Sequence, residues 1–207
     1  MNTRILLVDD HLVVRDALRR LLERRDGLSV VAEAADGHEA VRAYEQFRPD
    51  LTVMDISLPR MSGVLATRAI REVDPEARVL ILTMHDRACF VEDALQAGAV
   101  GYVVKTAPTH ELLNAVEAAL RSDVYLSPAI ARHAVHGAAT PEHKLSLRER
   151  QVLQGIVEGL GSKEIAADLH LSARTVGTHR ANIMRKLGLH KTSSLVRFAI
   201  REGLVPV

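Results

Sequence analysis

Five short aliphatic runs constrain the fold of this chain more than any other feature of its sequence. Each run is four or five residues long and mostly Val, Ile or Leu, and together they occupy residues 4–8, 28–32, 51–54, 78–82 and 100–104. Such runs are typical of parallel strands that are buried on both faces of a sheet. The intervals between them carry apolar residues at helical spacing. The alternation predicts an α/β domain with a doubly wound, five-stranded parallel sheet.

The chain beyond residue 144 has helical patterning alone. Ser146 and Glu149 fit a capping box, in which each side chain satisfies the other residue's backbone amide. Ser162 and Ser172 stand where a short helix and a longer helix would be capped, and a last helix is expected at about 192–202. A short helix, a tight turn and a longer helix within four helices predict a small all-α helix-turn-helix domain.

The distribution of charge also divides the chain in two. Residues 1–140 contain 16 Lys+Arg and 20 Asp+Glu, whereas residues 141–207 contain 11 and 6. An acidic front and a basic back indicate modules with different partners, and a basic module suggests nucleic acid. We expect the α/β domain at residues 1–125, a linker at 126–143 and the helix-turn-helix domain at 144–207.

Cysteine content and hydropathy bear on localisation. Cys89 is the only cysteine, so no disulfide can form within the chain. No apolar run approaches the length needed to span a bilayer, and the apolar run at the N-terminus is too short for a signal peptide. We therefore predict a cytoplasmic protein with no membrane partner.

Acidic and basic side chains follow the predicted strands. Asp9 and Asp10 end the first strand, Asp55 ends the third, Thr83 follows the fourth and Lys105 follows the fifth. Ligand sites of doubly wound sheets lie at the carboxyl ends of the strands, so these residues should share one edge. Converging carboxylates suit Mg²⁺. A carboxylate neutralised in this way can attack phosphorus and carry a phosphoryl group, whose oxygens an ammonium and a hydroxyl would bind.

Taken one by one, other polar residues near these strands have simpler interpretations. We interpret Asp36 and Asp50 as turn formers or helix caps. His11 has no second histidine or cysteine at metal-binding spacing, so we interpret it as a solvated loop residue. Tyr102 suits a buried core position as well as a moving switch.

Four segments resemble the receiver domains of response regulators over roughly residues 3–122. They are Leu-Val-Asp-Asp-His at 7–11, Met-Asp-Ile-Ser-Leu-Pro-Arg-Met-Ser-Gly at 54–63, Leu-Thr-Met at 82–84 and Gly-Tyr-Val-Val-Lys-Thr at 101–106. The resemblance implies that Asp55 is the phosphoacceptor. It implies Mg²⁺ ligands and switch residues as follows: Asp9, Asp10, Asp55 and the Ser57 carbonyl for the metal, and Thr83, Tyr102 and Lys105 for the phosphoryl group and the switch. Thr106 departs from the proline that many receivers carry.

The longer helix of the basic module has two contrasting faces. At about 100° per residue, Val176, Ile183 and Leu187 form one apolar stripe that should face the core. The opposite face is narrow enough to enter a major groove, and basic residues flank it at phosphate-contacting positions. The candidate DNA-binding residues are Lys163, Arg174, Thr175, Gly177, Thr178, His179, Arg180, Asn182, Arg185, Lys186 and Lys191.

Three segments of this module resemble the LuxR-type helix-turn-helix over about residues 144–205. They are Leu-Arg-Glu-Arg-Gln-Val-Leu at 147–153, Gly-Ser-Lys-Glu-Ile-Ala at 161–166 and the stretch from Ser172 to Gly188. A receiver followed by this module is similar to the NarL/FixJ group of response regulators. That resemblance implies a sensor histidine kinase, a homodimer when phosphorylated, DNA as the target, and no enzymatic activity beyond phosphoryl transfer to Asp55. Gly177 and Ala181 depart from the group, whose members often carry long side chains there.

Other functions stay open at this point. An aspartate-nucleophile phosphohydrolase of the haloacid-dehalogenase type would carry Asp-x-Asp on its first strand, whereas Asp9 and Asp10 are adjacent. A phosphorylation-dependent protein-interaction regulator with weak or lost DNA binding would be consistent with Gly177 and Ala181. A regulator active without phosphate would not need the acidic set.

Overall fold

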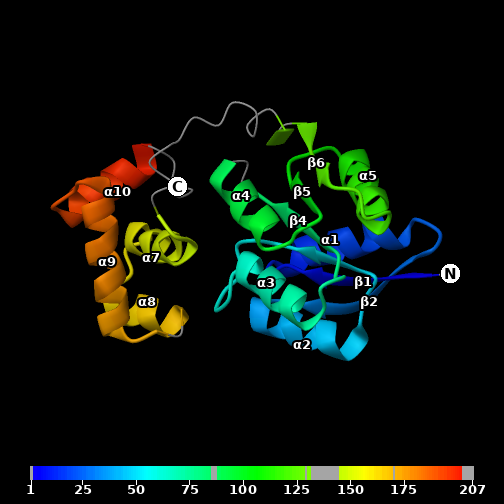
Figure 1. Ribbon diagram of the computed structural model, residues 1–207, viewed down its shortest axis with the longest axis horizontal. Coiled ribbons are helices and arrows are strands. Elements are labelled where there is room, and N and C mark those ends of the chain that lie inside the picture. The colour runs from blue at the N-terminus through cyan, green and yellow to red at the C-terminus, as the bar shows by residue number, and fades with distance from the viewer. Residues whose placement is uncertain (1, 85–87, 129, 132–144, 170, 202–207) are drawn as a thin grey trace. The chain divides into compact units, whose positions relative to one another are not determined.

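The computed structural model describes residues 2–84, 88–128, 130–131, 145–169 and 171–201. The chain divides into two compact units, an N-terminal unit at residues 1–137 and a C-terminal unit at residues 138–207. Figure 1 shows a sheet flanked by helices in the first and helices alone in the second, which confirms the predicted fold classes. Within the described residues, no helix is both long and apolar enough to cross a membrane.

The sheet of the N-terminal unit is parallel throughout. Its strands lie in the order β2-β1-β3-β4-β5-β6. The strand β2 therefore lies on one side of β1, and β3 to β6 follow one another on the other side. The strand bounds are Thr3–Val8 for β1, Leu28–Ala34 for β2, Leu51–Met54 for β3, Val79–Thr83 for β4, Gly101–Val104 for β5 and Tyr125–Leu126 for β6.

The sixth strand is an addition to the five that the sequence predicts. It has two residues, and Tyr125 pairs with Gly101 of β5. A side chain on Gly101 would meet Leu80 at 2.8 Å and the Tyr125 carbonyl at 3.1 Å, so glycine lets the edge strand approach. Two residues are too few to show strand periodicity, and β6 begins where the sequence analysis ended the first domain. The predicted linker therefore starts with a strand residue, Leu126, and continues beyond residue 131 outside the described residues.

Helices cover both faces of this sheet. Their bounds are Leu12–Glu23 for α1, Gly37–Phe47 for α2, Gly63–Val73 for α3, Ala88–Gln96 for α4 and Thr109–Leu120 for α5. One hydrophobic core joins α1 and α5 to a face of the sheet, through residues such as Leu22 and Val116. Helices α2, α3 and α4 cover the other face (Figure 1). The helices leave the carboxyl ends of the strands uncovered, and the loops that carry the acidic residues begin there.

The predicted cap at Asp36 is confirmed. Its buried carboxylate accepts hydrogen bonds from the amides of His38 and Glu39 and begins α2. Asp50 has a different role, because its carboxylate accepts the backbone amide of Arg4 in β1 at 2.7 Å. Asp36 is therefore a helix cap as interpreted, whereas Asp50 joins the segment before β3 to β1 rather than forming a turn or a cap.

The C-terminal unit contains helices at Leu147–Val157 (α7), Ser162–Asp168 (α8), Ala173–Leu187 (α9) and Thr192–Arg201 (α10). The capping box of Ser146 and Glu149 is confirmed, as is the Ser172 cap. The prediction that Ser162 caps α8 is wrong by one residue. Gly161 is the N-cap, and its amide is satisfied by the Glu164 carboxylate at 2.6 Å. Val176 and Ile183 are fully buried in the core of this unit.

Candidate functional site

The carboxyl edge of the sheet brings Asp9 and Asp55 together. Val8 of β1 is in register with Met54 of β3, and the Asp55 amide donates to the Val8 carbonyl at 2.9 Å. The residues that follow these strands are therefore neighbours. Asp9 is 1% exposed and Asp55 is 3% exposed. Two carboxylates this deeply buried require compensating charge.

Lys105 supplies part of that charge. Its Nζ lies 2.5 Å from Oδ2 of Asp55 and 2.7 Å from Oδ2 of Asp9. Burial alone would lower the pKa of Lys105, but the charge of Asp55 and hydrogen bonding to both carboxylates raise the pKa above its ordinary value. The ammonium therefore keeps its proton throughout the physiological range.

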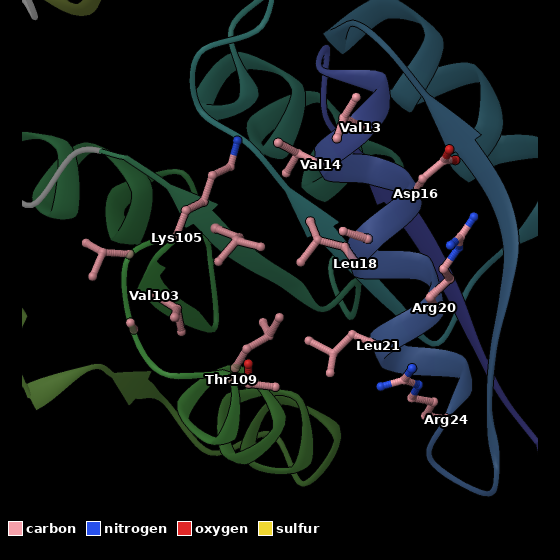
Figure 2. A pocket seen from close by; sticks show the side chains of 15 residues that line it. Val13, Val14, Asp16, Leu18, Arg20, Leu21, Arg24, Val103, Lys105 and Thr109 are labelled. Atoms are coloured by element: carbon pink, nitrogen blue, oxygen red, sulfur yellow. The ribbon is translucent and has the colours of Figure 1, made fainter.

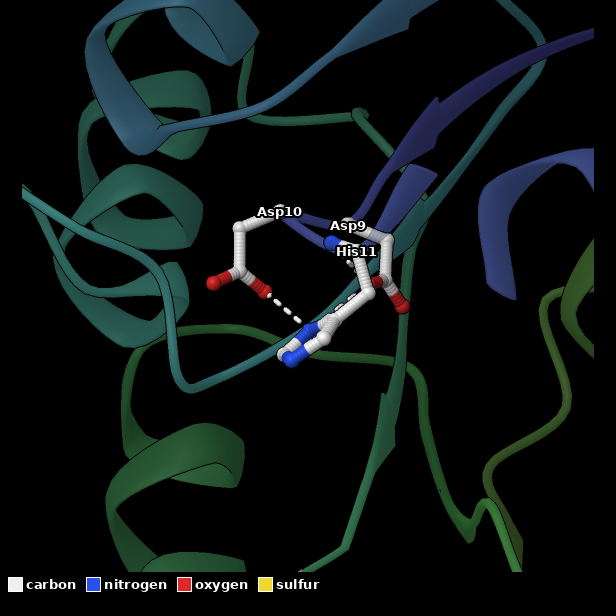
Figure 3. A group of neighbouring side chains, drawn as sticks. All are labelled: Asp9, Asp10 and His11. Atoms are coloured by element: carbon white, nitrogen blue, oxygen red, sulfur yellow. Dashed lines mark hydrogen bonds and ion pairs between the residues drawn. The ribbon is translucent and has the colours of Figure 1, made fainter. Parts of the chain in front are cut away.

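Asp10 completes the acidic set at the surface. Its carboxylate is 31% exposed and lies 2.7 Å from Nδ1 of His11, which is also 3.6 Å from Oδ1 of Asp9. Figure 3 shows the His11 ring directed at Asp10. The interpretation of His11 as a solvated loop residue is confirmed, since its ring is exposed, and the structure adds that the ring pairs with Asp10. The three residues offer ligand atoms within 4.8 Å of one another.

The donor set fits a hard divalent cation. Asp9, Asp10 and Asp55 provide only oxygen ligands and carry more negative charge than Lys105 neutralises. Oxygen ligands with remaining room for water are the environment that Mg²⁺ prefers. The loop from Asp55 also contains Ser57, whose amide donates to Oδ1 of Asp55 at 3.3 Å.

A close backbone contact fixes the loop that carries Asp55. Gly63, the first residue of α3, lies so near that a Cβ there would be 1.8 Å from the Asp55 carbonyl oxygen. The Gly63 amide also donates to the carbonyl of Ile56 at 3.0 Å. Glycine at this position therefore allows α3 to begin directly against the candidate phosphoacceptor.

Thr83 and Tyr102 lie within the sheet. Thr83 is the last residue of β4, is fully buried, and accepts the Lys105 amide on its carbonyl at 2.7 Å. Tyr102 lies in β5 and is fully buried as well. In this conformation Tyr102 occupies the core position that the sequence allowed as one of two interpretations.

Two arginines that the sequence analysis did not single out hold segments next to Asp9, Asp10 and Asp55, the residues that we call the acidic edge. Arg60 follows Asp55 in the loop to α3, adopts a φ of 60°, and pairs with Asp36 and with Glu39. Arg15 of α1 donates to the carbonyl of Asp9 at 2.6 Å. Neither residue carries a signal in the sequence, because each acts through a partner distant along the chain.

A pocket of about 770 Å³ opens beside Lys105. Val14, Leu18 and Leu21 of α1 face Val103 and Thr109 across it (Figure 2). Its lining is mainly apolar, with Lys105 at one end. Lys105 thus borders an apolar hollow between α1 and the segment from β5 to α5.

The outer face of α9 is exposed as the sequence predicts. Arg174, Gly177, Thr178, Ala181 and Arg185 are exposed on the helix side away from the core residues, and Asn182 beside them is half-buried. Arg185 donates to Oδ1 of Asn182 at 3.0 Å, and the Thr178 hydroxyl donates to the Arg174 carbonyl at 3.1 Å.

Other candidate DNA contacts have internal partners. Lys186 lies 2.6 Å from the carboxylate of Glu149, which is almost fully buried. Arg180 donates to the hydroxyls of Ser162 and Thr192 at 3.3 and 3.4 Å. Thr175 shares a hydrogen bond of 2.8 Å with Ser172 at the helix start. Lys163 and Lys191 are exposed, and His179 is half-buried.

Comparison with known proteins assigns both units to families. Residues 5–117 match the family described as response regulator receiver domain, and residues 143–199 match the bacterial regulatory proteins of the luxR family. Oxygen regulatory protein NreC of Staphylococcus carnosus (strain TM300) is 37% identical over 214 residues, spanning 98% of this chain and 99% of that protein.

Solved structures lead to the same assignment. A LuxR-family two-component response regulator from Aurantimonas sp. SI85-9A1 is 49% identical, with a TM-score of 0.64 over 66% of this chain and 97% of that one. Response regulator ChrA of a heme-sensing two-component system is 36% identical, with a TM-score of 0.57 over 99% of both chains. Membership of this family argues against the phosphohydrolase alternative. The chain is a NarL/FixJ-like two-component response regulator that combines a receiver domain with a LuxR-type DNA-binding domain.

Proposed function

We propose that a sensor histidine kinase phosphorylates Asp55 in a Mg²⁺-dependent reaction, and that this controls dimerisation and sequence-specific DNA binding. The observation that carries the proposal is the bridge of Lys105 between the buried carboxylates of Asp9 and Asp55. In this scheme the receiver domain is residues 1–125, the linker 126–143 and the DNA-binding domain 144–207. The protein acts in the cytoplasm, where its kinase donor and chromosomal target meet.

Each residue of the acidic edge has a role in phosphoryl transfer. An oxygen of Asp55 forms a bond to phosphorus while the bond from phosphorus to the donor nitrogen breaks, and that nitrogen takes up a proton. Asp9, Asp10, Asp55 and the Ser57 carbonyl would hold Mg²⁺, which neutralises the carboxylates and phosphoryl oxygens when bound. Lys105 is protonated and adjacent, so its ammonium can bind a phosphoryl oxygen.

Thr83 and Tyr102 would couple phosphorylation of Asp55 to a conformational change. The Thr83 hydroxyl would bind the phosphoryl group, since Thr83 ends β4 and its carbonyl already holds the Lys105 backbone. A dianionic group there favours one of two arrangements of the neighbouring loop and of Tyr102. That rearrangement would promote the homodimer.

The DNA interface centres on the exposed face of α9. Thr178 and Asn182 lie one turn apart and suit contacts with a thymine methyl group and an adenine edge. Arg174, Arg185, Lys163 and Lys191 are exposed cations that suit phosphates. Arg180 and Lys186 take a secondary part, because each already has a partner within the domain. The surface between these contacts is formed by Gly177, Ala181, Thr175 and His179.

The phosphoacceptor assignment is tested by mass. The protein is incubated with Mg²⁺ and a small acyl phosphate, and its intact mass is measured. We expect a gain of about one phosphoryl group, which Asp55→Asn and an excess of EDTA each abolish. Full labelling of Asp55→Asn would move the phosphoacceptor elsewhere, and full labelling in EDTA would remove the metal from the scheme.

A further inference from the structure

Arg15 is an inward-facing cation beside the acidic edge that has no part in the scheme above. Its side chain is only 14% exposed. Nη1 donates to the carbonyl oxygen of Asp9 at 2.6 Å, and Nε donates to Oε2 of Glu33 at 2.8 Å. One guanidinium thus joins α1, the end of β1 and β2.

This contact fixes the backbone from which two candidate metal ligands project. The Asp9 amide donates to the carbonyl of Ala34 at 3.1 Å, and Arg15 holds the carbonyl of the same residue. That carbonyl belongs to the planar peptide that joins Asp9 to Asp10. Its orientation therefore sets the direction in which the Asp10 backbone and carboxylate point.

Asp10 depends on this anchor more than Asp9 does. The Asp9 carboxylate is buried, lies 2.7 Å from the Lys105 ammonium and accepts the His11 amide at 2.9 Å. The Asp10 carboxylate is 31% exposed, and its contact in the structure is with the exposed His11 ring. Loss of the peptide anchor would leave Asp10 free to rotate into solvent.

The charge of Arg15 is matched by Glu33. The second oxygen of Glu33 lies 2.9 Å from Nη1 of Arg19, so the alternating charges of Arg15, Glu33 and Arg19 form a row of ion pairs. A cation without this partner would repel a divalent metal at the neighbouring carboxylates. Glu33 lets Arg15 hold the peptide without that penalty.

We propose that Arg15, neutralised by Glu33, is a positioning residue that sets the Asp9–Asp10 peptide for Mg²⁺ binding. The proposal rests on the proposed function of the acidic edge. Residues that orient metal ligands typically change metal affinity by 10- to 100-fold when they are replaced. Arg15 should therefore act on Mg²⁺ affinity rather than on the transfer step itself.

The test is a titration of the full chain with Mg²⁺, in which amide chemical shifts report metal binding. We expect Arg15→Gln to raise the Mg²⁺ Kd about 10-fold and Arg15→Lys to raise it less, since lysine can still donate to the Asp9 carbonyl. With a small acyl phosphate, half-saturating Mg²⁺ should rise in parallel, while the labelling rate at saturating Mg²⁺ stays within about twofold of the wild type, because Asp55 and Lys105 are unaltered. A general loss of folding would lower the saturating rate and leave the Mg²⁺ dependence unmoved.

Arg20→Gln is the matched control, because it removes the same charge from an exposed position of the same helix. Equal Mg²⁺ affinity of Arg15→Gln and Arg20→Gln would overturn the positioning role. If Arg15→Gln does not fold, the Glu33→Gln variant is titrated with Mg²⁺ instead. Weaker Mg²⁺ binding by Glu33→Gln than by the wild type supports the proposal, and equal affinity overturns it. Failure of the wild type itself to bind Mg²⁺ or take up phosphate would instead refute the proposed function.

Discussion

At the scale of single residues, the C-terminal unit separates cations with internal partners from exposed ones. Lys186 is held by Glu149, which links α9 to the start of α7 and also accepts the Ser146 amide at 2.7 Å. Lys191 is exposed and makes no ion pair with the residues that the structure describes. Lys186 lies in the last turn of α9 and Lys191 follows the helix, yet the two lysines should respond differently to replacement.

We expect Lys186→Ala to destabilise the C-terminal unit by about 1–2 kcal/mol, because it leaves a buried carboxylate without its cation. The partial exposure of Lys186 keeps this figure below that of a fully buried pair. Lys191→Ala should leave stability unchanged and lower the salt slope of DNA binding by about one. Denaturant unfolding and binding across a salt series measure both effects. The opposite pattern would make Lys186 the phosphate contact and Lys191 the structural residue.

Glu149 should make the stability of the C-terminal unit depend on pH in the acidic range. Burial alone would raise the pKa of Glu149, but hydrogen bonds from Lys186 and Ser146 lower the pKa below its ordinary value. A carboxylate with a lowered folded-state pKa stabilises the fold above its unfolded pKa of about 4.3, and the contribution is lost as pH falls through the folded value. Thermal unfolding of the wild type should therefore lose stability below about pH 4.3 more steeply than that of Glu149→Gln. Parallel curves for the two proteins would contradict this role.

At the scale of elements, two helical glycines have opposite surroundings. A Cβ on Gly63 would collide with the Asp55 carbonyl, whereas a Cβ on Gly177 would meet nothing within 4 Å. Gly63 is thus part of the geometry of the acidic edge. Gly177 is an exposed glycine within α9, where it costs helix stability.

The same substitution should therefore act in opposite directions. Gly63→Ala should destabilise the N-terminal unit by about 1–3 kcal/mol through overpacking, and it should slow labelling of Asp55 by displacing its backbone. Gly177→Ala, the matched control, should stabilise the C-terminal unit by about 0.5–1 kcal/mol and leave labelling unchanged. Unfolding curves and intact mass give both readouts. Normal labelling of a folded Gly63→Ala protein would show that the close contact is dispensable.

Local patterns explain how much of the fold was predictable. The five buried strands, the cap at Asp36 and the core stripe through Val176 each follow from periodicity or from one side chain near one amide. The edge strand β6 did not follow, because two residues carry no period. The N-cap of α8 was misplaced because glycine also suits an N-cap position, and here the Glu164 carboxylate accepts the Gly161 amide.

The candidate site was predictable where topology alone brings residues together. Strand order places Asp9 after β1 and Asp55 after β3, which are neighbours in the sheet. Lys105 follows β5 at the same edge of the sheet, and its ammonium contacts both carboxylates. The roles of Arg15 and Lys186 were not predictable, since each depends on a partner from another element: the Asp9 carbonyl and Glu33 for Arg15, and Glu149 for Lys186. Side-chain direction on a helix can be read from spacing, but the identity of a long-range partner cannot.

At the scale of the whole molecule, phosphorylation and DNA binding reside in separate compact units. Two couplings would satisfy the proposed function. Phosphorylation could join two copies of the chain, or it could expose α9 within one copy. These couplings differ in what they predict for a single DNA half-site.

We propose the first coupling and expect phosphorylation to increase affinity only for DNA that carries two half-sites. A dimer binds its second half-site at a high effective concentration, so two half-sites about one helical turn apart gain affinity that one half-site cannot. Full-length protein is therefore titrated onto duplexes with one or two half-sites, with and without an acyl phosphate, and its association state is followed by sedimentation. Phosphodonor should promote dimers and tighten binding to the paired site alone, and Asp55→Asn should respond in neither assay. An equal gain on the single half-site, without dimers, would show that phosphorylation uncovers α9 in one chain rather than joining two.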